Sequence, residues 1–88
     1  MDTMRCAMLL KKRGIRLDKE IGKYLIVDIL DFISEEAQNK LVNSTLNQLA
    51  IEELFRDSMK NTNIKNVDNE IMRRLNDPHY IEGLIQLA

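Results

Sequence analysis

Apolar residues are concentrated in one segment of the chain, between Asp18 and Ser34. On a helical projection of this segment the polar side chains form one narrow stripe, and apolar side chains cover nearly everything else. A helix that is apolar around most of its circumference must be surrounded by protein. The pattern therefore predicts a central apolar helix over roughly residues 19–33, with Asp18 as its N-cap.

A β-strand over residues 24–29 is the main alternative to this helix, because Ile26, Val27 and Ile29 are β-branched. The helix is preferred because the apolar run continues to Ile33 and has capping residues at both ends.

Short helices are expected on both sides of the central one. A first helix is predicted over residues 1–13, ended by Gly14. Ser34 is placed to cap the helix that follows the central segment. The sequence Asp77-Pro78 suits the start of the last helix, since aspartate favours the N-cap and proline the first helical position.

The segment from Glu35 to Lys60 has two interpretations. Thr45 and Gln48 have the spacing of a capping box, which favours a new helix at this point. One long helix over the whole segment is the alternative, and the pattern leaves both open. The polar run over residues 61–66 is the only convincing loop.

These elements predict an all-α fold. The expected architecture is a single helical domain over residues 1–88, a compact bundle of about five or six short helices around the central helix. A chain of this length buries only about 60–65% of its unfolded surface, so association with another chain would add to its stability.

Composition and charge bear on self-association and on the cellular compartment. The chain has 13 basic and 14 acidic residues and a net charge of −1, which does little to oppose self-association. A single cysteine, Cys6, excludes an intramolecular disulfide framework and is typical of a reducing compartment. The longest apolar run is interrupted by Asp28 and Asp31, so we expect no membrane span and a cytoplasmic protein.

Catalytic and metal-binding patterns are not found in the sequence. Cys6 and His79 are the only residues of their types and stand at opposite ends of the chain, whereas a structural zinc site needs about four such ligands. Asp28 and Asp31 would share a helix face, but a solvated stripe explains them better than a catalytic pair. We therefore expect no enzyme, no cofactor, no metal and no small-molecule substrate.

Charge is unevenly distributed along the chain. Residues 1–17 carry five basic side chains against one acidic one, and residues 18–57 carry nine acidic against four basic. Four of the N-terminal cations are candidates for phosphate contacts. These residues are Lys11, Lys12, Arg13 and Arg16. No aromatic side chains alternate with them to stack on bases, so nucleic-acid binding is the alternative and not the first hypothesis.

The first hypothesis is a small non-catalytic interaction module: a regulator, adaptor or inhibitor that binds protein, including another copy of itself as a homodimer. Methionines on one face of the first helix suit adaptable binding, and the central segment holds more apolar surface than a lone small bundle can cover. The candidate interface residues are Met4, Met8, Tyr24, Ile26, Val27 and Phe32.

Overall fold

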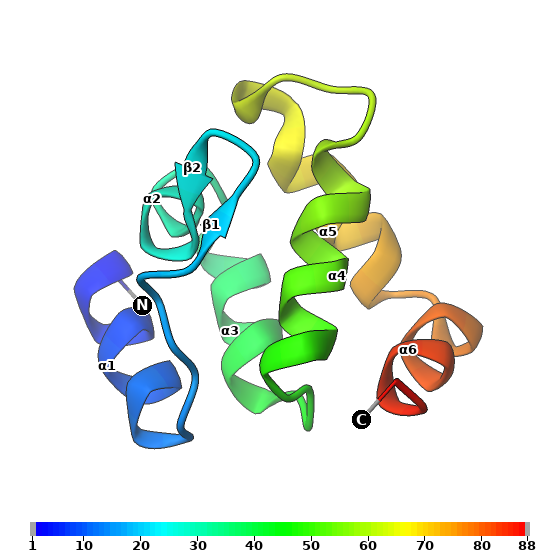
Figure 1. Cartoon of the computed structure of the whole chain (residues 1–88), viewed down its shortest axis with the longest axis horizontal. Helices are drawn as coiled ribbons and strands as arrows, with labels where there is room; N and C mark the ends of the chain where they lie inside the picture. Colours follow the sequence, from blue (N-terminus) through cyan, green and yellow to red (C-terminus); the bar gives the residue numbers. More distant parts are fainter. Residues whose placement is uncertain (1, 88) are drawn as a thin grey trace.

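Helices account for nearly all of the regular structure in the computed structural model, which describes residues 2–87 (Figure 1). The all-α prediction is confirmed, with six α-helices in this part of the chain. The elements in chain order are α1 (Thr3–Lys12), β1 (Glu20–Ile21), β2 (Tyr24–Leu25), α2 (Ile26–Leu30), α3 (Glu35–Asn43), α4 (Gln48–Met59), the 3₁₀ turn η1 (Ile64–Asn66), α5 (Val67–Leu75) and α6 (Pro78–Ile85).

The prediction of one helix over residues 19–33 is wrong. Its first half is the antiparallel hairpin β1–β2, and its second half is the five-residue helix α2. The strand alternative is right only for Tyr24 and Leu25. Asp18 caps nothing, since Leu25 holds the N-cap position of α2. The Asp28 carboxylate accepts a hydrogen bond from the Leu25 backbone N–H at 3.3 Å and so fixes the start of that short helix.

Gly22 is the physical reason for the error. The register pairs Glu20 with Leu25 and Ile21 with Tyr24, which leaves a two-residue loop. Gly22 has φ +62°, whereas no residue other than glycine has positive φ in the described chain. A positive φ at only the first loop residue is the arrangement of a type II′ turn, which favours glycine there. The hairpin therefore reverses the chain where a helix would have continued.

The segment from Glu35 to Lys60 forms two helices. Ser34 caps α3 as expected, because its hydroxyl accepts the Ala37 N–H at 3.1 Å. The cap of α4 is Asn47, whose side chain accepts the Ala50 N–H at 2.9 Å. Thr45, predicted for this role, lies in the connection between the two helices.

The end of α1 forms the predicted glycine cap. Gly14 has φ +89°, and its N–H donates to the Lys11 carbonyl at 2.9 Å. The next N–H, from Ile15, donates to the Leu10 carbonyl at 3.0 Å. These two bonds define a Schellman motif, which satisfies carbonyls at the helix end and turns the chain back toward the core. Met1, included in the predicted helix, lies outside the described residues.

The last two helices follow the predicted boundary. Asp77 caps α6 by accepting the His79 N–H at 3.0 Å and the Tyr80 N–H at 3.3 Å, with Pro78 in the first turn. The predicted loop over residues 61–66 contains the single turn η1.

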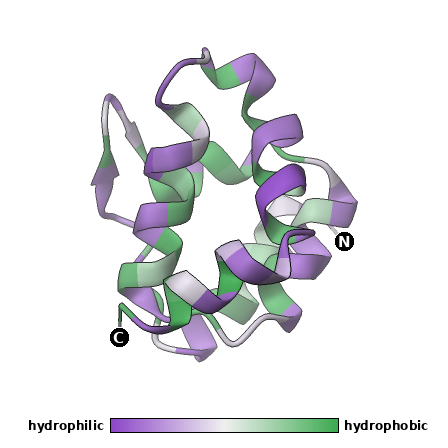
Figure 2. Ribbon diagram, turned by 90° about the vertical axis from the view of Figure 1, so that its right-hand side faces the viewer, coloured by the Kyte–Doolittle hydropathy of each residue, from purple (hydrophilic) through white to green (hydrophobic). Residues whose placement is uncertain are grey.

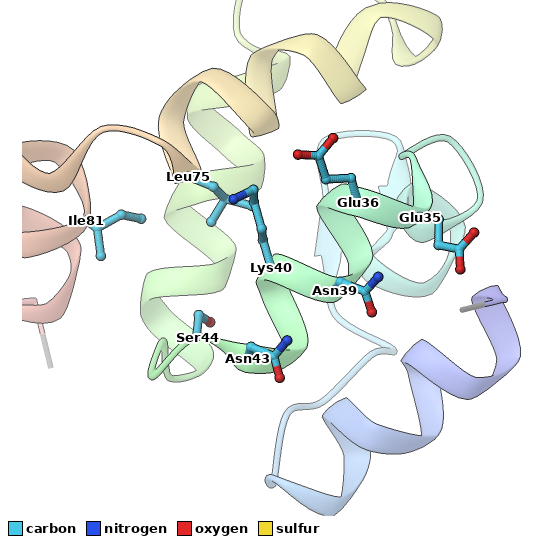
Figure 3. Close-up of a pocket in the computed structure, with 8 residues that line it drawn as sticks. All are labelled: Glu35, Glu36, Asn39, Lys40, Asn43, Ser44, Leu75 and Ile81. Atoms are coloured by element: carbon cyan, nitrogen blue, oxygen red, sulfur yellow. The ribbon is translucent and has the colours of Figure 1, made fainter.

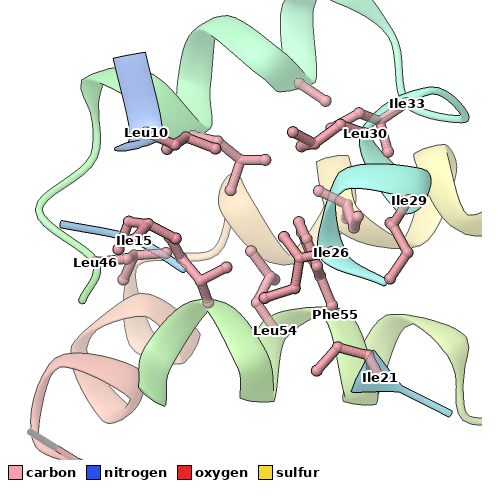
Figure 4. Close-up of a cluster of buried hydrophobic side chains, with 14 of the residues drawn as sticks. Leu10, Ile15, Ile21, Ile26, Ile29, Leu30, Ile33, Leu46, Leu54 and Phe55 are labelled. Atoms are coloured by element: carbon pink, nitrogen blue, oxygen red, sulfur yellow. The ribbon is translucent and has the colours of Figure 1, made fainter. Parts of the chain in front are cut away.

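One cluster of buried apolar side chains joins these elements (Figure 4). Phe55 and Leu54 of α4 lie at its centre beside Ile26 and Ile29 of α2, and all four are fully buried. Hydrophobic and hydrophilic residues alternate along the helices, as expected for helices with one face in a core (Figure 2). Over the described residues, no helix has the length and apolar character to cross a membrane.

Candidate protein-interaction surface

Two methionines stand exposed on the outer side of α1. Met4 is 74% exposed and Met8 is 57% exposed, whereas Cys6 and Leu10 of the same helix are fully buried. Residues four apart lie one above the other on a helix, so Met4 and Met8 form one continuous apolar strip. The strip faces away from the helix side that packs into the core.

Basic side chains flank this strip. At 100° per residue, Lys11 lies on one side of the two methionines, and Arg5 and Lys12 lie on the other. All three cations are exposed and form no ion pair within the described residues. We call Met4, Arg5, Met8, Lys11 and Lys12 the α1 outer face. It combines an apolar centre with a positive rim.

Arg13, a candidate nucleic-acid contact, forms hydrogen bonds with backbone carbonyls of its own chain. Its Nη1 donates to the carbonyls of Leu41 at 2.8 Å and Val42 at 3.1 Å, and its Nη2 donates to the carbonyl of Leu46 at 2.6 Å. Leu41 and Val42 are in the last turn of α3, where carbonyls have no partner within the helix. Arg13 therefore ties the end of α1 to the α3–α4 connection.

Arg16 is also engaged within the fold. Its backbone N–H donates to Gln48 Oε1 at 2.6 Å, and its carbonyl accepts from Gln48 Nε2 at 3.3 Å. Its side chain lies 3.5 Å from Asp18, in an exposed ion pair. The predicted basic cluster is thus divided, because Lys11 and Lys12 face solvent while Arg13 and Arg16 bind this chain's own groups.

The other predicted interface residues do not share one environment. Ile26 is fully buried in the core and cannot face a partner, which corrects its assignment. The sequence placed it on a helix surface, but it is the first residue of α2 and belongs to the core cluster. Tyr24 and Val27 are half-buried and pack against the core cluster. Phe32 is 43% exposed in the turn after α2.

A groove that the sequence pattern does not indicate lies between α3, α5 and α6 (Figure 3). It has a volume of about 690 Å³, and its apolar part consists of Leu75 from the end of α5 and Ile81 from α6. Figure 3 shows these two side chains reaching into the space between the helices. The α3 side is polar and is lined by Glu35, Glu36, Asn39, Lys40, Asn43 and Ser44. The spacing of apolar residues along the sequence does not indicate this surface, because the surface forms only when the three helices pack together.

Tyr80 holds α6 in position beside the groove. Its hydroxyl donates to the Asp57 carboxylate of α4, and its ring lies under the Arg74 guanidinium at 5.9 Å. Burial, together with the negative charge of Asp57, raises the pKa of the Tyr80 hydroxyl above its ordinary value of 10.0. The phenol therefore stays protonated and remains a donor to Asp57.

Arg74 is itself oriented by Glu70. The Glu70 carboxylate accepts from Arg73 at 3.0 Å and from Arg74 at 2.5 Å, and these hydrogen bonds hold its pKa below the ordinary value of 4.5. Since Arg74 also reaches Tyr80, this ion-pair group connects α5 to α6 and fixes one wall of the groove.

Cys6 is fully buried, and burial raises the pKa of its thiol, so it is a poor nucleophile. Within residues 2–87 no three His, Cys, Asp or Glu side chains are grouped closely enough to hold a metal ion.

Comparisons of the chain with protein-family models, with curated proteins and with solved structures found no match. The α1 outer face and the α3–α5–α6 groove are therefore interpreted from their own geometry and charge.

Proposed function

We propose that this chain is a small non-catalytic interaction module that binds protein through the α1 outer face and that associates with copies of itself. The observation that carries the proposal is the exposure of Met4 and Met8, one helical turn apart, on a helix whose opposite side is fully buried. Single exposed apolar residues are common on proteins, but a continuous strip with a polar rim is typical of a binding surface.

The chemistry of the strip favours a protein partner. Methionine is flexible and polarizable, and it adapts to irregular apolar surfaces. Complete burial of one such side chain contributes about 1.5–3 kcal/mol, so Met4 and Met8 together supply a useful part of a modest affinity. The rim cations Arg5, Lys11 and Lys12 favour a partner surface with acidic residues around an apolar centre.

Nucleic-acid binding has less support from the geometry. Duplex binding rests mainly on several cations that neutralise phosphates together. Arg13 already donates to three carbonyls, and Arg16 lies beside Asp18. The most exposed side chain at the centre of the α1 outer face, Met4, brings no charge to a phosphate.

Sedimentation velocity over a range of protein concentrations tests the proposal. The native chain is expected to associate reversibly, and the double substitution Met4→Gln/Met8→Gln is expected to weaken association at least tenfold. Both positions are exposed, so glutamine, a good helix former, should leave the helix intact.

Leu49→Gln is the matched control, because Leu49 is 56% exposed on α4, outside the α1 outer face. It should associate as the native chain does. A native chain that stays monomeric at all concentrations, or equal association of the methionine variant and the native chain, would contradict the proposal.

A further inference from the structure

We infer that the α3–α5–α6 groove of one copy receives the α1 outer face of another copy. This inference rests on the proposed function, and it names the partner surface that the function requires. The two surfaces are different, so the contact is heterologous.

The apolar parts of the two surfaces correspond. The groove has a volume of about 690 Å³ and is broadly open to solvent, so a convex surface can approach it. Leu75 and Ile81 form its apolar part, and both are half-buried, so each still has surface to cover. Met4 and Met8 project from a convex helix and lie one turn apart, which suits insertion of a short helical strip between α3 and α6.

The charges correspond as well. Glu36 stands exposed in the first turn of α3 at the wall of the groove and forms no ion pair within residues 2–87. The rest of the α3 wall is mostly uncharged and polar, with Lys40 as its one cation. Opposite it would lie Arg5, Lys11 and Lys12, so the Glu36 carboxylate and the neutral polar side chains of the wall meet a basic rim.

The arrangement of the helices excludes the chain's own α1 as the occupant, so an α1 in the groove must come from a second copy. Figure 3 shows α1 beyond one side of α3 and the apolar part of the groove, Leu75 and Ile81, beyond the other. Cys6 and Leu10 are fully buried, so α1 is fixed to its own core. Figure 1 likewise shows α1 and α6 at opposite sides of the molecule. Thus α1 cannot reach the groove of its own chain without unfolding.

Two lysines placed in the groove test the contact. Asn39 and Asn43 line the groove and are exposed, so Asn39→Lys/Asn43→Lys adds two positive charges there while preserving helix propensity. We expect this groove variant to lose at least tenfold in self-association by sedimentation velocity. The matched control, Asn61→Lys/Asn69→Lys, adds the same charge at exposed positions outside the groove and should associate normally. Circular dichroism establishes that each variant is folded.

Mixing two variants gives the decisive result. Met4→Gln/Met8→Gln retains a native groove, and Asn39→Lys/Asn43→Lys retains a native α1 outer face. At a concentration where each variant alone is monomeric, an equimolar mixture should form a one-to-one complex.

Native self-association of the groove variant would overturn the inference but leave the proposed function standing, because α1 would then bind another surface. Failure of the mixture to form a complex would also overturn it. A native chain that is monomeric at all protein concentrations would contradict both this inference and the proposed self-association on which it rests.

Discussion

Arg13 connects three parts of the molecule through one guanidinium group. Its two terminal nitrogens bind carbonyls of Leu41, Val42 and Leu46, and it stands directly after the last residue of α1. The positive charge lies at the C-terminal end of α3, where it also favours the helix dipole. The planar fork of arginine suits several acceptors at once, which lysine cannot reproduce.

We predict that Arg13→Ala lowers the free energy of unfolding by about 2 kcal/mol, because hydrogen bonds to charged groups contribute about 1.5–3 kcal/mol and the part-buried carbonyls of Leu41 and Leu46 would lose this donor. Arg13→Lys should recover only part of the loss. Urea denaturation measures both. Lys12→Ala, at the exposed neighbouring position, should change stability by less than about 0.5 kcal/mol. Equal effects at positions 12 and 13 would contradict this account.

Residues with local partners could be predicted from the sequence, and residues with distant partners could not. Ser34 and Asp77 cap helices whose N–H groups lie two or three residues away, so residue type and position were sufficient. Arg13 binds carbonyls 28 to 33 residues away. Nothing in its own neighbourhood distinguishes it from Lys12, and the sequence therefore grouped both as nucleic-acid candidates.

At the scale of elements, the segment from Glu20 to Leu30 shows that an apolar pattern can predict burial correctly without predicting the type of secondary structure. The apolar pattern correctly indicated burial, since Ile21, Ile29 and Leu30 are in the core. It did not decide between helix and hairpin, because a segment buried on several sides loses the period that distinguishes them. The decisive signal was Gly22, placed where a two-residue turn can form.

Two glycine substitutions should have opposite effects on the helices. Gly14 has φ +89° at the end of α1, so Gly14→Ala should destabilise the protein by about 1–2 kcal/mol. Gly83 lies within α6 without positive φ, and an added Cβ meets no atom within 4 Å. Gly83→Ala should therefore stabilise it by about 0.5–1 kcal/mol. Urea denaturation of both variants checks the signs, and a Gly14→Ala variant as stable as the native chain would refute the assignment of Gly14 as the helix cap.

The attachment of α6 to α4 should make stability sensitive to high pH. The folded protein raises the pKa of Tyr80 above 10.0, so the Tyr80–Asp57 bond contributes stability below pH 10, and this contribution is lost as pH rises above that value. Tyr80→Phe should be less stable at neutral pH and should show a smaller alkaline loss than the native chain. Tyr24→Phe is the control, since the Tyr24 hydroxyl forms no hydrogen bond within residues 2–87. Identical pH profiles for the native chain and Tyr80→Phe would exclude this role.

At the scale of the whole molecule, charges that are unevenly distributed along the sequence are also unevenly distributed over the folded structure. The basic N-terminal segment forms α1 at one side of the molecule, and acidic Glu36 stands on α3 at the wall of the groove (Figures 1 and 3). The sequence indicated a basic head and an acidic middle, and it named Met4 and Met8 as surface residues. It could not indicate the groove, which depends on how α5 and α6 pack beside α3.

This distribution predicts that salt weakens self-association. An exposed ion pair contributes about 0.2–1 kcal/mol, so screening the attraction between the basic rim and Glu36 should weaken association by up to about fivefold. Raising sodium chloride from about 20 mM to about 500 mM shortens the Debye length well below 10 Å and is sufficient for the test. Sedimentation velocity at each concentration gives the dissociation constant.

The variant Lys11→Glu/Lys12→Glu separates charge from apolar contact. Reversing the two cations should weaken association at low salt, and added salt should then strengthen it, because repulsion from the groove wall is screened. The variant Met4→Gln/Met8→Gln should associate weakly at every salt concentration, since its loss is apolar. If salt strengthened association of the native chain, apolar burial alone would drive the contact and the charge match between α1 and the groove would play no part in it.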